Sequence, residues 1–215
     1  MKSYKLTYSA KFEGVHEIPI IDRPSRIIIP ASVVPFSNRK RVKSSDNAIC
    51  FYEKDNLFSE IFSAPAKYLQ EFKNFQAVIS PDFSMYRDYP LWKQIDALGR
   101  NREIGSFWQR RGVNVIPNIR WGSEDTYTTS VLPEKVAFIG VPKHSIVALG
   151  SYGCFKHMED RYHFQAGLAA MMETLEPEIV LVYGAMPDSI FVAYQMYAKF
   201  IQYDNWTKRI HKGGI

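Results

Sequence analysis

The sequence contains little cysteine, and it lacks the spacings by which cysteine and histidine bind a structural metal. Its two cysteines, Cys50 and Cys154, are far apart, and each lies in an apolar run. Neither belongs to a CxxC pair, and no HExxH motif is present, so we expect no zinc site and no disulfide. Buried free thiols of this kind are typical of a reducing compartment.

Long apolar runs are also missing. No stretch approaches the roughly 18 apolar residues of a membrane-spanning helix, and no signal-peptide core follows the first residues. We therefore expect a cytoplasmic protein that does not contact a membrane.

Several common catalytic motifs are absent as well. The chain has no GxSxG elbow, no P-loop and no GxGxxG. This argues against a serine hydrolase of the usual kind, a P-loop NTPase and a dinucleotide oxidoreductase. No other cofactor motif is found, so no cofactor is expected. His157 and His163 flank two acidic residues, and we interpret this group as an exposed polar helix entry rather than a metal site.

What is present is typical of a globular domain. The chain has 215 residues, 46% of them apolar, which suits one large domain. Aromatic residues make up 14%, an excess that mainly indicates a large core. The net charge of +5 permits contact with a polyanion such as DNA or RNA without requiring it.

The first 46 residues differ from the rest. They contain several prolines and a basic run at residues 38–43, and only residues 26–29 resemble a buried strand. We therefore predict an extension over residues 1–46, packed on a main α/β domain over residues 47–215. Such basic runs are usually solvated loops, but Arg39, Lys40, Arg41 and Lys43 are also candidates for contacts with nucleic-acid phosphates.

From residue 47 onward, short apolar strands alternate with helices. Strands are predicted at residues 48–52, 75–80, 113–117, 145–150 and 179–183, and helices at residues 57–72, 90–111, 161–175 and 189–202. Residues 135–139 are either an extended piece or a short crossover. Such alternation is typical of a mostly parallel sheet covered on both faces. With about six β/α units, the fold is barrel-like, complete or incomplete, or an open doubly wound sheet; we slightly prefer the barrel.

Both folds place their functional face at the carboxyl ends of the strands, so residues that follow strands are candidates. These residues are Glu53, Lys54, Asp55, Ser80, Asp82, Ser84, Tyr86, Arg87, Asp88, Asn118, Arg120, Trp121, Ser151, Tyr152, Tyr183 and Gly184. The strongest segment is residues 80–88, where two carboxylates lie beside Arg87. Such a pair can divide acid and base roles, but Asp88 is better placed to cap the following helix.

Arg102 interrupts the apolar stripe of the helix predicted at residues 90–111. A buried charge should be paired, so Asp82 or Asp88 is its expected partner. Alternatively, its guanidinium could bind a phosphate or carboxylate. We predict that Asp82, Arg102 and Arg120 lie close together and form the catalytic candidates. The substrate-binding candidates are Ser80, Ser84, Asp88, Asn118, Trp121 and Tyr183.

A set of short motifs resembles a bacterial and phage family described as a domain of unknown function. The motifs are residues 80–84 (Ser-Pro-Asp-Phe-Ser), 90–92 with Gln94, 100–105 (Arg-Asn-Arg-Glu-Ile-Gly), 108–109, 112–113, 115–117 and 121–122. The resemblance is dense from about residue 75 to residue 121 and thinner to residue 184, and the first 46 residues do not clearly take part. It implies a protein of phages, plasmids or other mobile elements and supplies no activity and no catalytic residues.

Two functions follow as hypotheses. The first is a mobile-element protein that interacts with nucleic acid or nucleotide. Its support is the basic balance, the basic run, the Arg120-Trp121 pair and the resemblance. The second is a barrel-like small-molecule hydrolase or lyase that uses a strand-end Asp/Arg pocket. A continuous positive face at the strand ends would favour the first, and a closed polar pocket the second.

Overall fold

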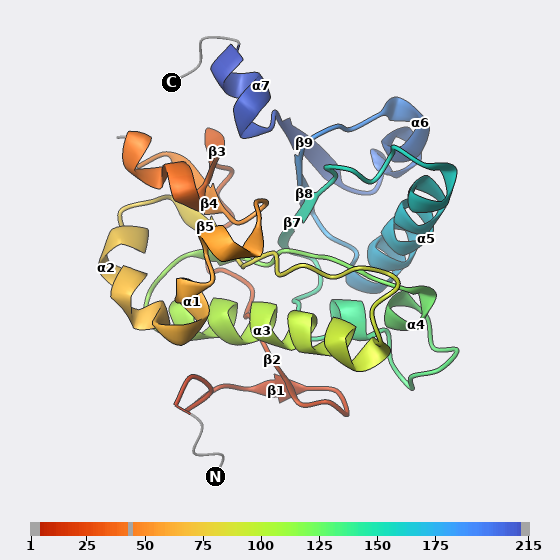
Figure 1. Cartoon of the computed structure of the whole chain (residues 1–215), viewed down its shortest axis with the longest axis horizontal. Coiled ribbons are helices and arrows are strands. Elements are labelled where there is room, and N and C mark those ends of the chain that lie inside the picture. The colour runs from red at the N-terminus through yellow and green to blue at the C-terminus, as the bar shows by residue number, and fades with distance from the viewer. Residues whose placement is uncertain (1–4, 43–44, 212–215) are drawn as a thin grey trace.

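Two parallel sheets form the centre of the protein. The computed structural model describes residues 5–42 and 45–211, and it has central strands surrounded by helices (Figure 1). One sheet has the order β3-β4-β5-β6, the other β7-β8-β9, and β1 and β2 form an antiparallel hairpin. The bounds are Phe12–Glu13 (β1), Ile18–Pro19 (β2), Ser32–Pro35 (β3), Asn47–Cys50 (β4), Ala77–Ile79 (β5), Val115–Ile116 (β6), Ile146–Gly150 (β7), Ile179–Tyr183 (β8) and Lys199–Tyr203 (β9). The predicted α/β class with parallel strands is confirmed.

The two sheets meet just beyond β6. Asn118 and Ala148 form a parallel bridge. The Ala148 amide donates to the Pro117 carbonyl at 2.9 Å, and the Ile119 amide donates to the Ala148 carbonyl at 2.7 Å. Because the strands and this bridge are all parallel, their carboxyl ends reach one common edge of the combined sheet.

Alternate side chains of both sheets pack against one another in a single inner cluster. Its members include Val33 of β3, Ile79 of β5, Ala148 of β7 and Leu181 of β8. No ladder joins β9 to β3 in the described ranges, so the strands there do not close into a barrel. Side-chain bonds nevertheless link the two edges: the Tyr203 hydroxyl donates to the Pro30 carbonyl at 2.6 Å.

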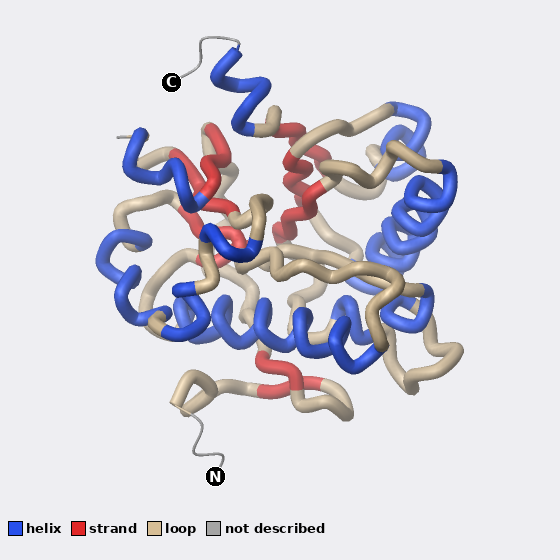
Figure 2. Tube along the Cα trace, in the orientation of Figure 1, coloured by secondary structure: helices blue, strands red, loops and turns tan. Residues whose placement is uncertain are grey.

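Helices lie around the outside of the strands (Figure 2). The α-helices are Glu60–Ser63 (α1), Leu69–Phe72 (α2), Leu91–Gln109 (α3), Glu124–Tyr127 (α4), Met158–Leu175 (α5), Asp188–Phe191 (α6) and Trp206–His211 (α7). The 3₁₀ helices are Phe36–Arg41 (η1), Asp55–Leu57 (η2), Pro65–Tyr68 (η3), Val136–Phe138 (η4) and Val192–Tyr194 (η5). Pro65 begins η3 directly after α1 and Ala64, as expected of a residue that cannot donate a helical hydrogen bond. None of the helices in the described ranges has the length and apolar character that crossing a bilayer requires.

The amino-terminal segment packs on α3. Ile21 is fully buried, and the Asp22 amide donates to the side chain of Gln109 at 2.7 Å, which in turn donates to the Asp22 carbonyl at 2.7 Å. The strand β3 is a full member of the first sheet, where Val33 pairs with Ala48 of β4, although it precedes residue 47.

Two predicted elements are wrong. Residues 26–29 form no strand, and Ile29 is 37% exposed; the strand comes later, at β3, because β4 pairs with Ser32–Pro35. The predicted helix over residues 189–202 contains only α6 and η5. Its last part is the strand β9, which finds its partner in the exposed edge of β8. In both cases a distant strand decides the local structure.

Two glycines of α3 provide a test of this packing. A Cβ at Gly105 would lie 2.5 Å from Ile21 Cδ1 and 3.0 Å from Ser80 Cβ, and both neighbours are fully buried. Gly105→Ala should therefore destabilise the protein by about 1–3 kcal/mol through overpacking. At Gly99 the nearest such atom is 3.9 Å away. Gly99→Ala should stabilise the protein by up to about 1 kcal/mol, because alanine forms helices better than glycine. Urea unfolding measures both changes, and midpoints that move in the same direction would contradict this packing.

Candidate functional site

Loops that follow β4, β5, β6 and β7 surround a pocket of about 410 Å³ at the carboxyl edge. We call it the strand-end pocket. It is lined by Tyr52, Glu53, Lys54, Asp82, Ser84, Tyr86, Arg120, Gly150 and Tyr152. The strand-end rule thus locates a real hollow, and several of the predicted residues line it.

An ion pair stands at the centre of this pocket. Arg120 Nη1 lies 2.8 Å from Asp82 Oδ2. The other carboxylate oxygen, Asp82 Oδ1, accepts a hydrogen bond of 2.9 Å from Asn118 Nδ2. Asn118 Oδ1 in turn accepts from the Tyr52 hydroxyl at 2.9 Å. Residues that follow three different strands therefore hold Asp82 and Arg120 in fixed positions.

Burial sets the electrostatics of this pair. The Asp82 side chain is 11% exposed and that of Arg120 is 34% exposed. Burial raises the pKa of Asp82, and Arg120 and Asn118 oppose that rise. The Asp82 carboxylate in turn raises the pKa of Arg120. The arginine thus stays charged, and the carboxylate depends on it for ionisation.

Arg102 lies beneath the pocket and not within it. It is 1% exposed and donates to the backbone carbonyls of Asn118 at 2.9 Å, Ala137 at 3.0 Å and Ile139 at 3.1 Å. The expected pair with Asp82 or Asp88 is wrong, because carbonyl oxygens and the side chain of Asn101 take up its donors. Burial lowers the pKa of Arg102 to about 9.

Asp82, Arg102 and Arg120 nevertheless lie close together. All three line a gap of about 10 Å³ between the strand-end pocket and α3. Ser80 belongs to the same support. It is fully buried, accepts from the Asn118 amide at 2.8 Å and donates to Asn101 at 3.0 Å. Ser80 and Arg102 therefore stabilise the residues beneath the strand-end pocket, and their own side chains do not line it.

Sequence reasoning missed Tyr52, which is the last residue of the strand predicted at residues 48–52. The sequence does carry a signal for it. Alternate residues of a strand face the same side, so Tyr52 should face the inner cluster together with Ala48 and Cys50, as it does. A Cβ at Gly150 would lie 2.7 Å from the Tyr52 ring, so the glycine leaves room for it. The ring also stacks on Tyr183, with centroids 5.1 Å apart. Tyr183 is buried there, and its hydroxyl accepts from the Trp206 amide.

A second hollow of about 290 Å³ adjoins the first. We call it the helix-side pocket, and its lining is Met85, Tyr86, Arg87, Arg120, Trp121, Gly122, Tyr152, Gly153, Cys154, Asp160, His163 and Phe164. Trp121 packs against Phe164 of α5 and donates to the His163 carbonyl at 3.1 Å. Arg87 holds the start of α5 through Glu159 at 2.8 Å and Asp160 at 2.7 Å.

Two further candidates contribute less than expected. Ser84 lines the strand-end pocket, but its hydroxyl donates to Asp55 at 2.8 Å and so ties two loops together. Asp88 is exposed in the turn before α3, and the cap position belongs to Pro90, with no side-chain cap bond. The predicted cap at Asp88 is wrong, because the helix begins one residue after Pro90, too far along the chain from Asp88.

The basic run is not a uniform set of free cations. Residues 38–41 of the run belong to η1, which directly follows the carboxyl end of β3. Arg39 is 12% exposed, pairs with Glu71 at 2.9 Å and stacks over the Phe36 ring at 3.9 Å. Lys40 and Arg41 are exposed, and Lys43 lies outside the described residues.

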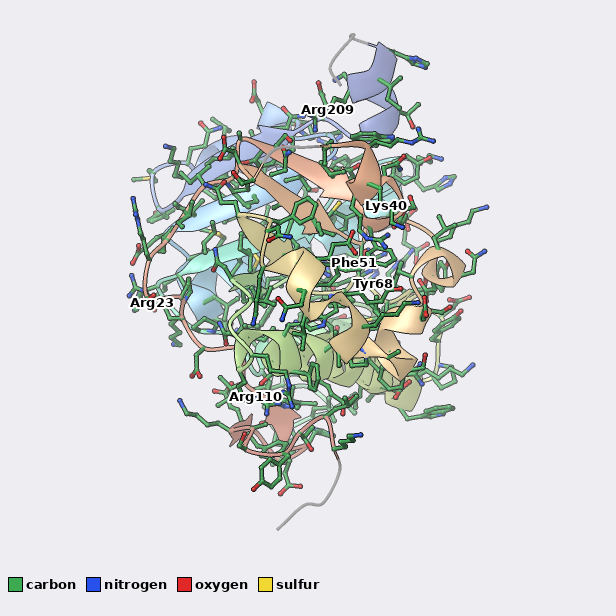
Figure 3. The ribbon with its side chains drawn as sticks, turned by 90° about the vertical axis from the view of Figure 1, so that its left-hand side faces the viewer. Arg23, Lys40, Phe51, Tyr68, Arg110 and Arg209 are labelled. Atoms are coloured by element: carbon green, nitrogen blue, oxygen red, sulfur yellow. The ribbon has the colours of Figure 1, made fainter. Side chains whose placement is uncertain are left out.

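A third hollow, of about 500 Å³, lies at the opposite, amino-terminal edge of the strands. Figure 3 shows Arg23, which lines it, and Lys40 on opposite sides of the molecule. Two of its arginines are already engaged: Arg23 pairs with Glu178 at 2.7 Å, and Arg110 donates to the Leu6 carbonyl at 2.7 Å. Because these two arginines already have partners, this hollow offers fewer free cations to a ligand than the carboxyl edge does.

In the residues that the structure describes, no group of three or more His, Cys, Asp or Glu side chains is arranged to hold a metal ion.

Comparison with known proteins adds the family. The model of the family described as Domain of unknown function (DUF4417) matches residues 10–204. The chain belongs to this family. The match includes residues 10–46, so the expectation that the amino-terminal segment takes no clear part is wrong. The segment supplies β3 to the first sheet, which explains why the family includes it.

Two phage proteins are similar to the chain. It is 29% identical over 176 residues to the Gene 1 protein of Mycobacterium phage D29, across 80% of this chain and 62% of that protein. It is also 29% identical over 176 residues to the Gene 1 protein of Mycobacterium phage L5, across 80% of this chain and 73% of that protein. The chain thus spans less than two thirds of the length of the first relative. No solved structure matches the chain.

The Asp82–Arg120 pair makes a prediction about pH. In Arg120→Met the opposing cation is lost, so burial should raise the pKa of Asp82 further above its unfolded value. The variant should lose about 1–3 kcal/mol of stability at neutral pH, less than a fully buried pair would lose, because Arg120 is 34% exposed.

This loss should shrink as the pH falls through the raised pKa of Asp82 in the folded state and disappear below about 4, the unfolded-state pKa of aspartate, where Asp82 becomes protonated in both states. Urea unfolding from acidic to neutral pH measures it. Adding Asp82→Asn should restore part of the stability at neutral pH. A loss of equal size at every pH would contradict the assignment.

Proposed function

We propose that the protein interacts with nucleic acid or nucleotide through the carboxyl edge of its sheets. The observation that carries this proposal is the combination, in one place, of exposed unpaired cations, exposed aromatic rings and two adjoining pockets.

The cations come from three strand ends. Lys40 and Arg41 follow β3, Lys54 follows β4 and Lys156 follows β7. All are exposed, and within the described ranges none of them forms an ion pair. Phosphate binding needs such free cations, since each one that contacts a phosphate displaces a counterion.

Three acidic residues of the same edge are already engaged. Glu53 accepts from the Ser37 amide and hydroxyl. Asp55 accepts from Ser84, and Asp82 pairs with Arg120. Carboxylates that already hold donors repel a polyanion less than free ones, so the field at this edge favours phosphate.

Aromatic rings supply the second requirement. Tyr86 is 54% exposed and Tyr152 is 73% exposed, and both line the strand-end and helix-side pockets. Exposed rings beside arginine and lysine are the means by which proteins stack unpaired bases. Trp121 remains a candidate at the floor of the helix-side pocket, although its ring is largely packed on α5.

The origin of the relatives is consistent with this proposal. Both similar Gene 1 proteins come from mycobacteriophages. We therefore propose a role in a mobile element, with DNA or RNA as the partner.

We further propose that the seven parallel strands act as an incomplete barrel. The support is the single inner cluster shared by both sheets and two side-chain bonds, one from β9 to Pro30 just before β3 and one from α7 to Ser32 of β3. In such a fold the loops at the carboxyl ends form one ring around the site.

A second candidate function is catalysis on a small molecule. The observation that favours it is Asp82, a carboxylate in the pocket whose pKa is raised by burial. A raised pKa suits a general acid or base, and Arg120 beside it could bind an anionic substrate.

The salt dependence of binding tests the first function. The double variant Lys40→Gln/Arg41→Gln should lower the slope of log affinity against log salt by roughly 0.7–0.9 for each phosphate that the protein no longer neutralises. Lys54→Gln/Lys156→Gln should act in the same way. Titrations of DNA and RNA from about 50 mM to about 200 mM salt measure the slope.

Two controls accompany these variants. Arg23→Gln/Arg26→Gln makes the same charge change at the opposite edge and should leave the slope unchanged. Arg39→Gln should destabilise the protein but not change the slope, because Arg39 is 12% exposed and already paired. If the wild type binds neither DNA nor RNA at low salt, the nucleic-acid function is wrong.

Thermal shift with small phosphates and carboxylates tests the second function. A ligand of the strand-end pocket should raise the melting temperature of the wild type, because binding to the folded state alone stabilises it. The same ligand should have little effect on Arg120→Gln. Equal shifts in both proteins would argue against binding at this pair.

A further inference from the structure

The two pockets at the carboxyl edge share a common wall. Tyr86, Arg120 and Tyr152 line both the strand-end pocket and the helix-side pocket. Each comes from a different loop, after β5, β6 and β7 respectively. The wall therefore combines one guanidinium with two exposed rings, and a hollow lies on either side of it.

Arg120 is fixed in this wall while keeping donors for a ligand. Its Nη1 bonds Asp82, whose carboxylate is itself held by Asn118. No bond from its Nε or Nη2 occurs within the described residues, and its side chain is 34% exposed. A guanidinium held at one nitrogen can offer the others to a phosphate in a defined orientation, at little cost in side-chain entropy.

The volumes fit small units on each side of the wall. The pockets measure about 410 Å³ and about 290 Å³, so each is the size of a site for one small ligand group and not for a helix or duplex. Rings in the wall can stack on a planar group in either pocket. The two pockets and Arg120 thus fit a ligand in which an anionic group lies between two planar groups.

We propose, on the basis of the proposed nucleic-acid function, that the ligand is a single strand that crosses this wall. Two consecutive bases enter the two pockets, and the phosphate between them lies on Arg120. A duplex cannot bind in this way, because its bases are paired and stacked inside the helix. Duplex DNA would contact only the exposed cations of the edge.

The test compares one sequence as a single strand of about 12 nucleotides and as a duplex, by fluorescence anisotropy at fixed salt. The single strand should bind at least about tenfold more tightly. Tyr86→Ala and Tyr152→Ala should each weaken single-strand binding by about five- to 150-fold, the range measured for loss of one base stack, with the salt slope unchanged. Duplex binding should change little.

Tyr162→Ala is the matched control. Tyr162 is an exposed tyrosine at 64%, on α5, and it lines neither pocket. Its removal should leave binding unchanged. Arg120→Lys keeps the charge beside Asp82 but loses the planar group, and it should weaken the single strand more than the duplex. Melting temperatures establish that each variant is folded.

The outcomes separate the two proposals. Absence of binding to any nucleic acid at low salt overturns both. If the wild type binds but prefers duplex, or binds both forms equally, the single-strand proposal fails and the edge function stands. The same conclusion follows if Tyr86→Ala and Tyr152→Ala have no more effect than Tyr162→Ala.

Discussion

Asn118 lies where the two sheets meet, and its hydrogen bonds connect this junction to the candidate site. Its position forms the bridge to Ala148, where the sheet of β6 meets the sheet of β7. Its amide donates to Ser80, its carbonyl accepts from Arg102, and its side chain bonds Asp82 and Tyr52. Every polar atom of this buried residue is therefore engaged. Because unpaired polar groups are costly in a low-dielectric interior, a shift of this residue would break these bonds together, along with the two bonds that its neighbours Pro117 and Ile119 make to Ala148 of the second sheet.

The buried Arg102 helps to fix the Asp82–Arg120 ion pair of the strand-end pocket. Arg102 donates to carbonyls at the end of β6 and in the crossover around η4, so it fixes the loop that carries Asn118 and Arg120. Arg120 then faces the pocket with its orientation set by Asp82. The two arginines thus have different tasks. One stabilises the scaffold through neutral oxygens, and the other presents a charge at the surface.

Much of the architecture could be predicted from periodicity alone. The strands β4, β5, β7 and β8 are short apolar runs, and each was predicted within a few residues. Among the parallel strands the exceptions, β3 and β9, lie at the two edges of the strand order. β9 is only partly buried and β3 is short, so the conformation of both depends on pairing with a neighbouring strand. Prediction from local sequence pattern therefore failed at the two strands whose conformation depends on tertiary contacts.

The same division applies to the site. The sequence by itself determined that polar residues gather after parallel strands, because parallel strands are buried and their carboxyl ends reach one edge. It also placed Asp82 and Arg120 in that set. Only the tertiary structure decided which of them meet. The register of β5 against β6 brings Asn118 beside Asp82, the ion pair with Glu71 withdraws Arg39, and carbonyls replace a carboxylate as the partners of Arg102. These contacts join residues far apart in the chain, and their geometry follows from strand register, which no local pattern encodes.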